Sequence, residues 1–142
     1  TGPTGVATAT LRSPVRAGAL RVTARSGVYS AEWPVTVRPA PPANLTLVVE
    51  PARVPSGGTV RAVATVVDAF ANPVPGAVVR FECTIGRAEP VEATTDARGV
   101  AVSAIVVGAP GSGVVRAALG TLADERSLVV ERLKIVLPLV QR

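Results

Sequence analysis

The sequence lacks the residue types on which most catalytic and metal sites depend. It contains no histidine, which excludes Ser-His-Asp and Cys-His catalysis and removes the commonest metal ligand. Its one cysteine, Cys83, follows Phe81 in a stretch of alternating apolar residues, a pattern typical of a buried structural thiol rather than a nucleophile. A single cysteine also excludes an intrachain disulfide. The sequence therefore predicts no catalytic residue, no bound cofactor and no enzyme activity.

Carboxylates near turns are the remaining candidates for a metal site. These are Asp68, Asp96 and the Asp124-Glu125 pair. Calcium usually takes six or more oxygen ligands from a clustered site, so convergence of the Asp68 and Asp124 loops would make at best a weak metal site. The favoured interpretation is that Asp68 and Asp96 accept hydrogen bonds from nearby backbone N–H groups and fix their turns.

Three other features bear on binding and modification. Asn44-Leu45-Thr46 matches the N-glycosylation pattern, which makes Asn44 a possible acceptor. Tyr29 and Trp33 could form a sugar-binding platform, but Trp33 alternates with valines such as Val35, so we expect Trp33 in a core. The only lysine, Lys134, lies in the C-terminal tail, which argues against an isopeptide crosslink inside the fold.

Composition narrows the class of protein further. The net charge of +5 comes from arginines that are scattered singly along the 142 residues, which does not favour nucleic-acid binding. No apolar run is long enough to span a bilayer. Hydrophobic residues make up 48% of the chain and aromatic residues only 3%, so we expect a core of Val, Ala and Leu. Thirteen glycines and thirteen prolines indicate many short strands joined by turns.

Residues 44–131 alternate between apolar and polar side chains along seven short segments, with turn residues between them and no helical periodicity. This pattern predicts a complete all-β sandwich. A weaker strand is expected at residues 89–94. In the other six, the side chains expected to point inward are Leu45, Leu47 and Val49; Val60, Ala62, Ala64 and Val66; Val79, Phe81 and Cys83; Ala101, Ser103 and Ile105; Val115 and Ala117; and Leu128 and Val130.

Residues 1–39 repeat the end of that sandwich. Gly5 aligns with Gly99 and Gly18 with Gly113, at an offset of 94 to 95 residues. We therefore expect residues 1–39 to form the last three strands of an incomplete domain. Residues 40–43 continue a proline-rich stretch, which predicts a short, stiff spacer. The apolar faces of the three expected strands are Ala7, Ala9 and Leu11; Leu20, Val22 and Ala24; and Trp33, Val35 and Val37.

Two turn motifs carry a family resemblance. Asn72-Pro73-Val74-Pro75-Gly76 is followed by Val79-x-Phe81, and later by Thr95-Asp96-x-x-Gly99-x-Ala101. This combination resembles the bacterial immunoglobulin-like domains that occur in tandem in invasin- and intimin-type surface proteins, although Gly2 replaces the aspartate in the first copy. The resemblance implies an immunoglobulin-like sandwich. It also implies an extracellular, non-catalytic repeat of the bacterial cell surface that spaces, stiffens or adheres beside neighbouring domains of its kind.

The incomplete domain would expose an apolar face made of Leu20, Val22, Trp33 and Val35. Three strands with such a face need a partner. We expect copies of the chain to supply it head to tail by β-strand addition, which would build an open filament. The expected donor is the apolar tail at residues 132–142, which presents Leu133, Ile135, Leu137 and Leu139.

Alternatives to the filament remain open. The tail is equally suited to extend the last strand of its own domain. The chain could instead be a piece of a multidomain adhesin whose immunoglobulin-like repeats act as spacers, or an accessory module of a secreted hydrolase. An extracellular location would require a leader that was removed or that lies upstream of Thr1.

Overall fold

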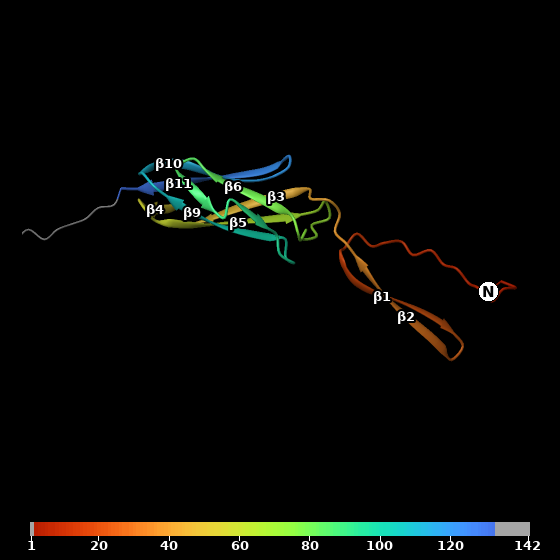
Figure 1. Ribbon diagram of the computed structural model, residues 1–142. Helices are drawn as coiled ribbons and strands as arrows, with labels where there is room; N and C mark the ends of the chain where they lie inside the picture. The colour runs from red at the N-terminus through yellow and green to blue at the C-terminus, as the bar shows by residue number, and fades with distance from the viewer. Residues whose placement is uncertain (1, 133–142) are drawn as a thin grey trace, which may run out of the picture. The chain divides into compact units, whose positions relative to one another are not determined.

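The computed structural model describes residues 2–132, which contain eleven β-strands and no helix (Figure 1). Accordingly, none of these residues belongs to a helix that could cross a membrane. The chain divides into two compact units, Thr1–Pro39 and Ala40–Arg142. The tail residues named above as strand donors, Leu133, Ile135, Leu137 and Leu139, lie outside the described residues.

The second unit is a sandwich of two sheets. One sheet has the order β4-β11-β10-β6-β8, and the other has the order β3-β5-β9-β7. All neighbours pair antiparallel except β4 and β11, which pair parallel. The strands are β3 (Asn44–Glu50), β4 (Arg53–Pro55), β5 (Thr59–Val67), β6 (Val78–Cys83), β7 (Gly86–Glu89), β8 (Glu92–Thr94), β9 (Val100–Val107), β10 (Gly111–Leu119) and β11 (Leu122–Glu131).

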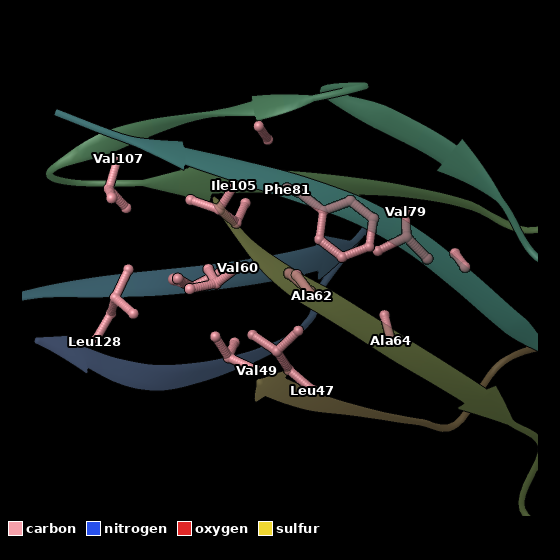
Figure 2. Packing of buried hydrophobic residues seen from close by; sticks show 14 of the residues in the cluster. Leu47, Val49, Val60, Ala62, Ala64, Val79, Phe81, Ile105, Val107 and Leu128 are labelled. Carbon is pink, nitrogen blue, oxygen red and sulfur yellow. The ribbon is translucent and has the colours of Figure 1, made fainter. Parts of the chain in front are cut away.

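The core lies between the sheets and follows the predicted alternation. Side chains from both sheets meet there, among them Leu47 and Ile105 of one sheet and Phe81 and Leu128 of the other (Figure 2). All four are at most 1% exposed. Phe81 is the only aromatic residue in the buried cluster, and valines and alanines fill most of the remaining space. The predicted all-β sandwich is therefore confirmed.

Two details of the predicted strands are wrong. Residues 89–94 do not form one strand: β7 ends at Glu89 in one sheet, and β8 begins at Glu92 in the other. Pro90 lies between them, and it has no N–H to continue a ladder. The three-residue edge strand β4 was not predicted, because so short a segment carries no readable alternation.

The two signature turns pack against each other. Thr95 donates its hydroxyl to the carbonyl of Val74 at 2.7 Å and accepts the N–H of Ala77 at 2.9 Å. Gly99 has a φ of +73° and passes so close to the carbonyl of Val66 that no side chain would fit there. Thr95 is thus required by its hydrogen bonds to the first turn, and Gly99 by its close approach to the Val66 backbone.

The first unit contains a single antiparallel hairpin, β1 (Gly18–Ser26) and β2 (Tyr29–Val37). The first of the three predicted strands, around Ala7–Leu11, is absent: no strand occurs between Gly2 and Ala17. Its counterpart in the second unit, β9, is paired on one side with β5 and on the other with β7. Within residues 2–39 no counterparts of these two partners occur, and the segment is not paired there.

The hairpin repeats β10 and β11 at an offset of 93 residues rather than the predicted 95. Gly18 and Gly111 both have a φ of +146°, and the turn glycines Gly27 and Gly120 have φ values of +61° and +58°. The alignment of Gly18 with Gly113 was therefore wrong by two residues. The preceding turn does follow the predicted offset of 94. The N–H of Gly2 donates to the carbonyl of Val6, as the N–H of Asp96 donates to the carbonyl of Val100.

Candidate interaction surface

The β1–β2 hairpin separates its apolar and polar side chains onto two faces. Leu20 lies opposite Val35 and Val22 lies opposite Trp33. Residues directly opposite each other in an antiparallel ladder share a face, so these four side chains form one surface, which we call the hairpin face. The other side of the ladder is polar and includes an ion pair in which Arg21 approaches Glu32.

The hairpin face is uncovered within the described part of the chain. No residue of β1 or β2 is buried, and the side chain of Trp33 is 74% exposed. The matching side of β10 and β11 is closed: Val115 and Leu128, the counterparts of Val22 and Val35, are both 0% exposed. The same pattern therefore produces a core in one unit and an open surface in the other.

Several strands close the corresponding face in the complete sandwich. β10 is flanked by β6 and β11 is flanked by β4, while β3 of the opposite sheet packs on both β10 and β11. The N–H of Leu47 in β3 also donates to Asp124 of β11 at 2.8 Å. Counterparts of these strands are not present in residues 2–39, so the hairpin has neither neighbours in its sheet nor an opposing sheet.

Trp33 is exposed in the described chain, as expected for the open face of an incomplete domain, and burial of Trp33 in a completed domain stays a prediction. Its counterpart in the complete sandwich is Arg126, which is exposed and paired with Asp124. Trp33 therefore lies at the rim of the face rather than at its centre. Tyr29 is 78% exposed on the same side of β2. A sugar-binding role for this pair of aromatic residues stays a prediction.

Asp68 is buried at the end of β5 and serves the fold. Its carboxylate accepts N–H groups from Phe70 and Asn72 on Oδ1, and from Ala40 and the Asn72 amide on Oδ2, all at 2.8 to 2.9 Å. Desolvation by burial opposes ionisation, but these hydrogen bonds, that of the Asn72 side chain foremost, outweigh it and lower the pKa of Asp68 to about 2.

The structure does not join Asp68 and Asp124 into a metal site. Asp124 is engaged elsewhere, by the N–H of Leu47 and by the guanidinium of Arg126. Within residues 2–132, no group of three or more potential ligands is close enough to hold a metal ion. Asp96 fixes its own turn by accepting hydrogen bonds from the N–H groups of Val100 and Arg98. The same hydrogen bonds lower the pKa of Asp96.

The other predicted positions are dispersed. Asn44 is exposed at the start of β3, so its side chain is accessible for glycosylation, which stays a prediction. Cys83 is partly buried and packs against the core. A shallow groove on the outer side of the four-stranded sheet has Glu50 and Glu89 among its lining residues. Their backbones lie three inter-strand spacings apart in the sheet, about 14 Å.

Comparison with known proteins identifies the fold. No family model and no curated protein sequence matches the chain. Among solved structures, the adhesin InvE of Yersinia pseudotuberculosis is similar over 63% of the chain, at 24% identity and a TM-score of 0.55. The D0-D1 domains of intimin match 80% of the chain at 16% identity and a TM-score of 0.59. The chain has the fold of the invasin- and intimin-type immunoglobulin-like domains.

Invasin, described as a bacterial integrin-binding protein, matches 80% of the chain at 17% identity and a TM-score of 0.56. Two Bacteroides glycosidases are also similar over 79% and 80% of the chain, at 12% and 13% identity and TM-scores of 0.54 and 0.52. The chain spans about a quarter of the InvE and invasin structures and 63% of the intimin fragment. At these identities the comparisons establish the immunoglobulin-like fold.

Proposed function

We propose that the chain is a non-catalytic structural module of an extracellular stalk or filament on a bacterial surface. In this proposal the β1–β2 hairpin is the end of a second immunoglobulin-like sandwich, completed by strands from outside residues 2–132. One observation carries it: the nine residue pairs of β1 and β2 match the nine pairs of β10 and β11, yet the side that forms a core in one is open in the other.

Leaving the hairpin face open costs the first unit stability. A two-stranded hairpin is at best marginally stable in water, and full burial of a Val or Leu side chain contributes about 1.5 to 3 kcal/mol. Leu20, Val22 and Val35 are only partly buried. Covering strands would therefore stabilise the first unit substantially.

Two sources of covering strands are compatible with the proposal. In a filament, copies of the chain complement one another head to tail, with the apolar tail (residues 132–142) as the donor. In a multidomain adhesin, the strands come from the same polypeptide. A single donated strand would pair with one edge of the hairpin but would leave the opposing layer empty, whereas the complete domain uses a four-stranded sheet there. This requirement favours covering strands from the same polypeptide.

A module attached to a secreted hydrolase is the second candidate function. The similarity to Bacteroides glycosidases supports it. In that case catalysis would reside in another part of the polypeptide. An activity screen of the natural full-length protein on glycosides separates this candidate from a stalk, for which no turnover is expected.

Sedimentation and negative-stain electron microscopy of residues 1–142 test the main proposal. Concentration-dependent filaments that disappear on deletion of Leu133–Arg142 would support complementation between copies. A monomer whose β1–β2 amides exchange rapidly would support strands from the same polypeptide. A monomer in which these amides are as protected as those of β10–β11 would contradict the proposal, since the hairpin would then need no covering strands.

A further inference from the structure

The linker between the two units contains very few hydrogen-bond donors. Among residues 39–43, Pro39, Pro41 and Pro42 have no backbone N–H. Only Ala40 and Ala43 can donate from the main chain. The N–H of Ala40 donates to Oδ2 of Asp68 at 2.9 Å, and the N–H of Ala43 donates to the carbonyl of Val67 at 2.9 Å. Every backbone donor of the linker is thus bonded to the complete domain.

We propose that Asp68 is a clamp that holds the linker, residues 40–43, on the complete domain. The clamp reaches over 28 residues of sequence, whereas the other bonds of this carboxylate lie within its own loop, to Phe70 and Asn72. Both backbone donors of residues 40–43 are therefore anchored on the domain. The short, stiff spacer predicted from composition stays a prediction.

The remaining contacts fix the carboxylate in place. Asp68 donates its own N–H to the carbonyl of Asn72 at 2.9 Å, and Ala71 donates to the carbonyl of Asp68 at 3.1 Å. Ala71 adopts a φ of +64°, which is costly for a residue with a side chain. These two hydrogen bonds hold the loop in spite of the unfavourable backbone of Ala71. Asp68 therefore presents Oδ2 to the linker in one defined position.

The linker itself is restricted before it reaches the clamp. Proline fixes its own φ and restricts the residue that precedes it to extended geometry. Arg38, Ala40 and Pro41 each precede a proline. The backbone around Ala40 is therefore restricted as well as anchored. The clamp does not depend on the proposed function.

The substitution Asp68→Asn tests the clamp with almost no change of shape. All four groups that face the carboxylate are N–H donors. An asparagine amide that keeps its oxygen against the two backbone N–H groups of Phe70 and Asn72 turns its NH₂ group against Ala40, and the Asn72 amide, unlike a backbone N–H, can flip to accept from it. The matched control is Asp96→Asn, which disturbs another turn-fixing carboxylate whose partners are Arg98 and Val100. Both variants are made in the full chain of 142 residues.

Amide hydrogen exchange of Ala40, measured by NMR, is the readout. In the wild type we expect Ala40 to exchange far more slowly than an unstructured peptide. In Asp68→Asn its exchange should accelerate about tenfold or more, the effect of losing a bond to a charged acceptor, while Asp96→Asn leaves it unchanged. If Asp68→Asn unfolds the domain, the exchange rate of the Ala40 amide in the wild type tests the proposal by itself. Unprotected Ala40 in the wild type, or unchanged protection in a folded Asp68→Asn variant, would overturn the proposal.

Discussion

The two hairpins of this chain, β1–β2 and β10–β11, have the same register and different surroundings. Val22 and Val115 occupy equivalent positions and belong to equivalent ladders, but only Val115 has an opposing sheet and is buried. Local sequence therefore suffices to define a hairpin, including the left-handed glycine of its turn. Burial depends on strands distant in sequence, and this dependence marks the hairpin face as the candidate interaction surface.

The largest expected effect comes from truncating equivalent core positions. Leu128→Ala should destabilise the complete sandwich by about 2 to 5 kcal/mol, because it removes a fully buried side chain and leaves a cavity. Val35→Ala, at the counterpart position, should change the unfolding free energy of that sandwich by less than about 0.5 kcal/mol. Urea unfolding measures both. Similar losses in the two variants would mean that the hairpin face is already covered.

The second comparison uses the equivalent turn glycines. Gly99→Ala should cost at least about 2 kcal/mol, because it forces a left-handed backbone and drives a Cβ into the carbonyl of Val66. Gly5 has nearly the same φ but no atom of another residue within contact distance of an added Cβ. Gly5→Ala should therefore leave the thermal unfolding of the complete sandwich unaltered. A stable Gly99→Ala protein would contradict the packing of the two signature turns.

Acid should destabilise the complete sandwich through Asp68, and residues 2–39 contain no counterpart of this aspartate. The pKa of Asp68 is about 2 in the folded chain and near 3.9 in an unfolded one. Its contribution to stability is thus complete above about pH 4 and is lost as the pH falls toward 2. Urea midpoints between pH 5 and pH 2 should fall less steeply for Asp68→Asn than for the wild type. Parallel pH profiles would rule out this role for Asp68.

The smallest effect is expected where the two units are alike. Arg21–Glu32 in the first unit and Arg116–Glu125 in the second are exposed ion pairs on β-hairpins. Exposed pairs contribute little, so Arg116→Ala should change the unfolding free energy by less than about 1 kcal/mol and Arg21→Ala should leave it unchanged. Calorimetry on both variants checks this. A larger loss would show that the outer face of the sheet matters more than its exposure indicates.

Alternation predicted most of the complete sandwich, because one buried face per strand leaves a period-two signal in residues such as Val60, Ala62 and Val79. It did not predict the sheet change at Pro90 or the parallel edge strand β4, which depend on pairing rather than on period. The strand expected around Ala9 does not form for the same reason: its side chains alternate, but no partner strands for it occur among residues 2–39.

The candidate site was predicted in its residues and less well in its geometry. Leu20, Val22, Trp33 and Val35 alternate and share the exposed face as expected. The clamp between Ala40 and Asp68 was not predicted, because a hydrogen bond between residues 28 positions apart leaves no periodic signal. The available clue was that three prolines leave the linker only two donors.

The most direct test is to complete the first sandwich artificially. Residues 44–94 of the chain are placed before Thr1, which aligns with Thr95, and hydrogen exchange of β1–β2 is compared with and without this addition. The account predicts that amides around Val22 and Val35 change from rapid exchange to the protection of their counterparts at Val115 and Leu128. Unchanged rapid exchange in a protein that folds two cooperative units would contradict the claim that the hairpin is the end of a second immunoglobulin-like sandwich.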